Sequence, residues 1–151
     1  FILFSNCGYQ PIYSKNSGNF NIGNIEIKTT NNLNYKIKNG LKVFSNSNFK
    51  KNYDLEIDGK QIIDIVSKDS KGNPKIYKMT VKINTKIIKN YKVLKEISFQ
   101  ESFNYNNNSN KFKLKQYEKN IRKNLVKKNI ENITFYISNI EWSLNHLNLI
   151  K

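Results

Sequence analysis

The stretch YKMTVKINTKI, residues 77–87, has the clearest two-residue periodicity in the chain. Its large apolar side chains fall on odd-numbered positions, whereas lysine, threonine and asparagine fill the even ones. Successive side chains of a β-strand point to opposite faces of the sheet. The pattern therefore predicts a strand with one buried apolar face and one wet, basic face. The apolar positions are Tyr77, Met79, Val81, Ile83 and Ile87.

Two more strands are expected on either side of this one. Upstream, alternate apolar residues run from Tyr53 to Ile65, interrupted at 58–59 by Asp-Gly, where we expect a bulge or kink. Residues 69–74, DSKGNP, have the composition of a tight turn. Downstream, a turn at 89–90 leads into a strand over 91–105. Short turns between consecutive strands predict antiparallel pairing.

Helical periodicity appears before and after these strands. After a short strand over 22–27 and cap-type residues at 29–32, apolar residues recur every three or four positions over 33–44. A longer stripe runs from Leu114 to Ile137 and predicts the longest helix. Its other face carries lysines, as a solvated face commonly does. Ser138-Asn139 is expected to interrupt it, so 139–151 is assigned to a C-terminal tail.

These elements predict an α+β fold in the order β-α-β-β-β-α. The economical arrangement is a four-stranded, mostly antiparallel sheet with both helices packed on its apolar face. The 151 residues suffice for one compact domain, placed at 20–138. No later apolar run approaches the roughly 18 residues that a membrane-spanning helix requires.

The composition is strongly basic, with 26 Lys and Arg against 11 Asp and Glu and a net charge of +15. Such an excess favours a polyanionic partner: nucleic acid, an anionic membrane or a phosphorylated glycolipid. The excess is almost wholly lysine and accompanies abundant Asn and Ile. Part of it therefore reflects AT-rich codon usage.

Several kinds of chemistry are disfavoured by the composition. A single cysteine, Cys7, can form neither an internal disulfide nor a thiolate zinc cluster. His146 lies alone in a polar C-terminal segment, which argues against a Cys-His or Ser-His-Asp site and leaves lysine or carboxylate chemistry open. We expect no enzyme, no cofactor and no metal site.

The N-terminus has the pattern of a lipoprotein precursor. The apolar run 1–4 fits the end of a signal-peptide core, and Phe4-Ser5-Asn6-Cys7 places an apolar residue three before a cysteine. We predict a signal remnant at 1–6, and a lipidated N-terminus and linker at 7–19 anchored by an acylated Cys7. Phe4 and Asn6 depart from the usual residues. The alternative is a small buried cysteine in an edge strand.

Three stretches together resemble the LptE family, the lipopolysaccharide-assembly lipoproteins of Gram-negative outer membranes. Residues 7–13, CGYQPIY, are similar to the opening of alphaproteobacterial members. The hairpin 67–81 resembles the family's central hairpin. Residues 102–105, SFNY, followed by Phe112 and by Tyr117-Glu118, look like the family's strand end and helix start. The chain would be a divergent member, with the resemblance covering 7 to about 138.

The resemblance implies a role in lipopolysaccharide transport to the cell surface. The protein would be a plug and assembly partner inside the LptD β-barrel, anchored at the outer membrane on its periplasmic side. Gly8, where an inner-membrane lipoprotein often has Asp, agrees with that location. The resemblance also implies direct lipopolysaccharide binding by basic residues at one end of the sheet, where two chain reversals bring the hairpin and the second helix together. By position these are Lys68, Lys71, Lys111, Lys113 and Lys115.

The positive charge has other possible explanations. Taken singly, each lysine could be ordinary surface charge. A nucleic-acid binder with aromatic stacking residues is disfavoured, because the strand aromatics share parity with the Ile and Val residues that must face the helices. An unrelated basic lipoprotein that acts as a scaffold for another anionic partner remains the alternative.

Overall fold

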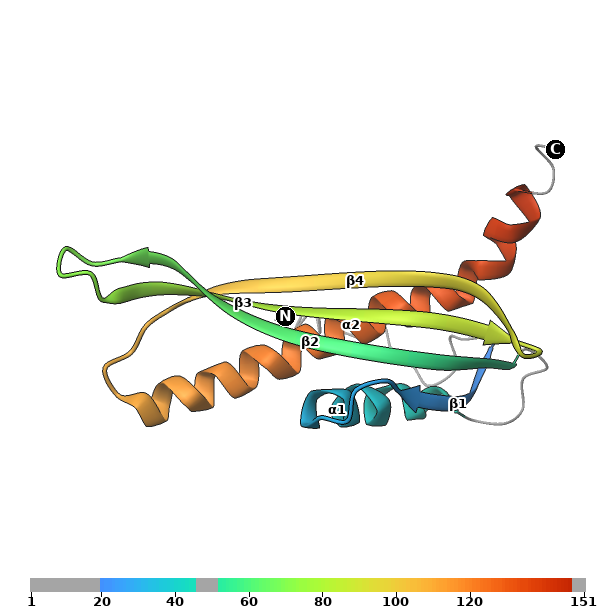
Figure 1. Cartoon of the computed structure of the whole chain (residues 1–151), viewed down its shortest axis with the longest axis horizontal. Coiled ribbons are helices and arrows are strands. Elements are labelled where there is room, and N and C mark those ends of the chain that lie inside the picture. The colour runs from blue at the N-terminus through green and yellow to red at the C-terminus, as the bar shows by residue number, and fades with distance from the viewer. Residues whose placement is uncertain (1–19, 46–51, 148–151) are drawn as a thin grey trace, which may run out of the picture.

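The structure is one long, twisted sheet with helices on one face (Figure 1). The computed structural model describes residues 20–45 and 52–147, with backbone only from residue 141 onward. The sheet order is β1-β2-β3-β4, with β1 parallel to β2 and the other pairs antiparallel. The predicted α+β class and element order are confirmed. The elements are β1 (Asn21–Ile27), α1 (Asn32–Leu41), the 3-10 turn η1 (Lys42–Phe44), β2 (Asn52–Lys68), β3 (Pro74–Lys89), β4 (Lys92–Asn106) and α2 (Lys111–Leu147).

Two tight turns set the register of the antiparallel strands. The predicted turn before β3 is closed by Asp69 N–H donating to Asn73 O at 2.8 Å, and Gly72 takes the positive φ of 84° that glycine tolerates. Between β3 and β4, Asn90 and Tyr91 both have positive φ, as a two-residue hairpin turn requires. Residue Ile83 consequently pairs with Gly59 on one side and Phe99 on the other.

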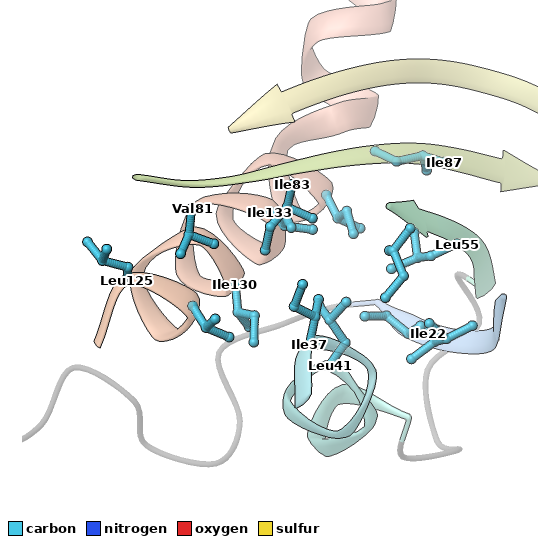
Figure 2. Close-up of a cluster of buried hydrophobic side chains, with 14 of the residues drawn as sticks. Ile22, Ile37, Leu41, Leu55, Val81, Ile83, Ile87, Leu125, Ile130 and Ile133 are labelled. Carbon is cyan, nitrogen blue, oxygen red and sulfur yellow. The ribbon is translucent and has the colours of Figure 1, made fainter. Parts of the chain in front are cut away.

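The hydrophobic core lies between the odd-numbered face of the sheet and α2 (Figure 2). Val81 and Ile83 of β3 are buried, and so are Leu125, Ile130 and Ile133 of α2. Helix α1 completes the layer with Ile37 and Leu41. Removing such side chains from water stabilises the fold by about 1.5–3 kcal/mol each, so the two periodicities, two in the strands and 3.6 in the helices, determine the architecture.

Helix α1 is fixed to the sheet edge by one buried amide. The Asn31 side chain caps the helix by accepting from Asn34 N–H at 2.8 Å. The fully buried side chain of Asn34 donates to Thr29 O at 2.7 Å and accepts from Gly59 N–H at 2.6 Å. These bonds satisfy backbone groups that lie beyond the end of the short strand β1.

The bulge or kink expected at 58–59 is not observed, because β2 pairs with β3 without interruption there. The register shifts instead between Ile65 and Ser67. Gly59 is needed for space: a Cβ at this position would lie 2.4 Å from Ile37 Cδ1 and 2.7 Å from Asn34 Oδ1. The glycine therefore permits the close approach of α1 to the sheet.

Helix α2 continues through the expected break at 138–139 as far as Leu147, so most of the segment assigned to a C-terminal tail is helical. Ser138 Oγ donates to Thr134 O and Asn139 Nδ2 to Phe135 O, each at 2.8 Å and each to the residue four positions back. These side chains are satisfied inside the helix and do not terminate it. In the described part of the chain no helix could span a bilayer.

We predict that Asn34→Ala lowers the free energy of unfolding by about 1–3 kcal/mol, because the buried Gly59 N–H loses its acceptor and the link to Thr29 O is also lost. Urea denaturation followed by circular dichroism measures the change. The exposed Asn32→Ala is the matched control. Equal stabilities of the two variants would contradict the role given to Asn34.

Candidate functional site

Basic residues from distant parts of the sequence meet at one end of the sheet. There the β2–β3 hairpin projects, at the left of Figure 1, and α2 begins near the same end. We call this end the distal pole: the hairpin turn 68–75, the end of β4 at 104–106 and the segment 107–117. Since β4 pairs with β3 up to Ile76↔Asn106, the chain enters α2 beside the hairpin.

Residue Asn107 joins the two halves of the distal pole. Its backbone N–H donates to Lys75 O at 2.9 Å and its Nδ2 donates to Pro74 O at 2.8 Å. Lys111 Nζ in turn donates to Asn107 Oδ1 at 3.4 Å. Asn110 accepts from Lys113 N–H at 3.1 Å and so caps α2. The hairpin and the start of the helix are thus held together by asparagines.

A cavity of about 570 Å³ lies within the distal pole. Three kinds of side chain line it: aliphatic residues, two tyrosines, and polar or basic residues from the end of β4, the loop after it and the start of α2. Such a mixture suits a ligand that has both apolar and charged parts. The lining residues are Val66, Ile76, Asn104, Tyr105, Asn106, Asn107, Asn108, Lys113, Leu114 and Tyr117.

Tyrosines form the inner wall of this cavity. Tyr105 stacks on Tyr77 with 5.6 Å between ring centroids and meets Tyr117 edge-on at 6.2 Å. The Tyr105 hydroxyl donates to Glu118 Oε1 at 2.8 Å. Burial, together with this bond and the charge of Glu118, raises the pKa of the Tyr105 hydroxyl, which therefore remains a neutral donor.

The hairpin turn is organised by the carboxylate of Asp69. Its Oδ1 accepts from Lys71 N–H at 2.9 Å and from Asn73 N–H at 2.8 Å. The bonds from Asn73 lower the pKa of Asp69 below its usual 3.8. An acid in the middle of a basic turn is explained by this local role, which fixes the backbone of the turn.

All five lysines predicted to bind lipopolysaccharide lie in the distal pole and are exposed. Lys113 lines the cavity, Lys68 and Lys71 are on the hairpin turn, and Lys111 bonds to Asn107. Lys115 lies on α2 but does not line the cavity. Cys7, the predicted lipidation site, lies outside the described residues.

Sequence reasoning missed part of the site. Exposed Lys75 belongs to the same turn and was not singled out. The sequence pattern also does not reveal the roles of Tyr105, Tyr117 and Asn107. The two tyrosines fit ordinary apolar stripes, and residues 106–110 have the composition of a polar loop. The run of asparagines was the available signal, because asparagine commonly bonds to nearby backbone.

Comparisons with known proteins support the fold. No protein-family model matches the chain, and no curated protein is detectably similar to it in sequence. Among solved structures, the rare lipoprotein B of Shewanella oneidensis superposes with a TM-score of 0.63 at 12% identity, covering 83% of this chain and 100% of that one. A minor lipoprotein from Acinetobacter baumannii gives 0.60 at 14%, covering 81% and 93%. Lipoprotein B from Nitrosomonas europaea gives 0.60 at 13%, covering 84% and 88%. The chain therefore shares the fold of these bacterial lipoproteins.

The turn should respond to acid through Asp69. Because its pKa in the folded protein is below 3.8, its stabilisation of the turn is present above about pH 4 and is lost as the pH falls through the lowered pKa. Amide NMR shifts of Lys71 and Asn73 should report one transition below pH 3.8. The transition should be absent in Asp69→Asn. A midpoint at or above 3.8 would refute this assignment.

Proposed function

We propose that this chain is a lipid-anchored outer-membrane lipoprotein that binds lipopolysaccharide. It would act as plug and assembly partner of an LptD-type β-barrel in lipopolysaccharide transport to the cell surface. The observation that carries this proposal is the distal pole, where exposed lysines of the hairpin turn and of the start of α2 lie at the same end of the sheet as a cavity that Lys113, aliphatic residues and tyrosines line.

The chemistry of the distal pole fits a phosphorylated glycolipid. Ammonium groups attract phosphates, and the cavity wall of Val66, Leu114 and Tyr117 offers apolar surface to acyl chains. A single exposed charge pair contributes only about 0–1 kcal/mol and is screened by salt. Binding therefore needs the lysines as a group, and Asn107 joins the two segments that carry them.

The remaining surface fits a position inside a barrel. The even-numbered face of β3 presents Lys78, Lys82 and Lys86, with Lys86 paired to Glu56 at 3.2 Å. The lumen of an outer-membrane barrel is itself polar, so a polar sheet face matches it. A plug needs no catalytic group, and we propose no enzymatic activity.

Replacing Lys68, Lys71, Lys113 and Lys115 together by glutamine should weaken lipopolysaccharide binding at least about tenfold at low salt, because four partly additive phosphate contacts are lost. Surface plasmon resonance on immobilised lipopolysaccharide measures this. The control replaces Lys60, Lys78, Lys82 and Lys92, which removes the same charge elsewhere. An equal loss in the control would mean that net charge alone is responsible.

The anchor and the barrel partner are tested in outer membranes of cells that express the whole precursor. We expect mass spectrometry to find acylation on the peptide that begins at Cys7, and an intact β-barrel to copurify with the protein. Cys7→Ser should abolish acylation. Acylated protein that brings down no barrel would favour the alternative, a basic scaffold for another anionic partner.

A further inference from the structure

A second cavity lies on the helical side of the molecule, between α1 and α2. It measures about 700 Å³ and no described strand residue lines it. Figure 2 shows the two helices facing each other through Ile37 and Leu41 on one side and Ile130 on the other. We call this cavity the α1–α2 groove. It shares no lining residue with the cavity of the distal pole.

The floor of the groove is apolar. It is formed by Val126 and Ile130 of α2 together with Gly40 and Phe44. Gly40 lets the helices approach: a Cβ at this position would lie 2.4 Å from Ile130 Cδ1. Beside the floor, the Val43 side chain is 75% exposed. An exposed aliphatic residue next to an apolar hollow suggests that something apolar covers both.

The rim of the groove is positively charged. Lys36 of α1 and Lys119 and Lys123 of α2 line it, and none of the three has an ion-pair partner among the described residues. The one acid in the lining, Glu131, is 3.9 Å from Lys127. An occupant with a negative group would therefore complement this rim.

The lining of the groove extends along α2. Its lining follows α2 from Lys119 to Thr134, which at 1.5 Å per residue is about 22 Å. The hydrocarbon of one bilayer leaflet, roughly half of a 30 Å core, is filled by acyl chains of that order of length. A concave groove accepts one chain lengthwise, whereas a bilayer surface needs a flat or convex face.

We propose that the α1–α2 groove binds a single-chain anionic amphiphile, with the alkyl chain along the floor and the negative headgroup at the lysine rim. A free fatty acid and an alkyl phosphate share this chemistry. The site is independent of the distal pole and of the function proposed for it, because different residues form it.

Photolabelling of the full chain with a diazirine derivative of palmitate tests the site. Peptide mass spectrometry should place the label on segments 36–44 and 119–134. Excess palmitate and monomeric dodecyl phosphate should each remove the label, while uncharged dodecyl maltoside should not. If only one of the anions competes, it identifies the headgroup. Equal competition by the maltoside would overturn the proposal, because the rim would then contribute nothing.

Amino-acid substitutions distinguish binding in the α1–α2 groove from binding to other surfaces. Lys119→Glu with Lys123→Glu should reduce labelling at least about tenfold, since two attractive charges become repulsive. The exposed Val43→Glu should do the same with little effect on the fold. The matched control, Lys82→Glu with Lys92→Glu, and the distal-pole variant should both label normally.

Three results would overturn the proposal: full labelling of the folded rim variant, label confined to Tyr105 and Tyr117 peptides, or a dimer that the rim variant dissociates. The last would assign the groove to a second copy of the chain. Circular dichroism of every variant shows whether it is folded, and light scattering gives its molar mass in solution.

Discussion

The structure depends on the covering of one sheet face by one helix. Strands β2, β3 and β4 place most of their buried apolar residues on the odd-numbered face, and α2 covers that face with a stripe from Leu114 to Ile140. The 17 residues of β2 and the 37 of α2 both extend about 55 Å, so a single helix is long enough to match a whole strand. In Figure 1 the tip of the β2–β3 hairpin extends past the start of α2, while the last turns of α2 leave the sheet past its edge at β4. Part of the hairpin is therefore left without a helix over it, and Ile63 and Ile65 remain exposed there although they lie on the apolar face.

The same geometry separates two kinds of surface. At the distal pole the helix begins and the hairpin projects, so exposed lysines of both lie at the end of the sheet that holds a cavity lined by Tyr105, Tyr117 and Lys113. On the helical side, α1 lies against α2 at Gly40, and the lysines of the solvated faces border an apolar floor. Both surfaces join positive charge to apolar area, but the first is held by asparagine bonds to backbone and the second by helix packing. This division explains how a chain with a net charge of +15 can present more than one specific surface.

Much of the fold was readable from the sequence, because alternation over 77–87 and the helical stripe after Leu114 are set by burial. Two local expectations were wrong for identifiable reasons. Gly59 resembled a kink, but its role is to leave room for Ile37 and Asn34, which come from a distant segment. Ser138 and Asn139 resembled a helix end, but they bond to carbonyls one turn back. The meeting of the two lysine sets followed from topology, whereas the cavity and the α1–α2 groove depend on side-chain packing that periodicity does not encode.

The short length of β1 has a consequence for motion. It pairs with β2 only from Asn52 to Ile57, so among the described residues the distal half of β2 has a strand neighbour on one side only. Regions with few buried contacts and solvent-exposed hydrogen bonds open locally at a fraction of the global unfolding free energy. The molecule therefore combines a rigid body with an arm that can adjust its shape without unfolding the core.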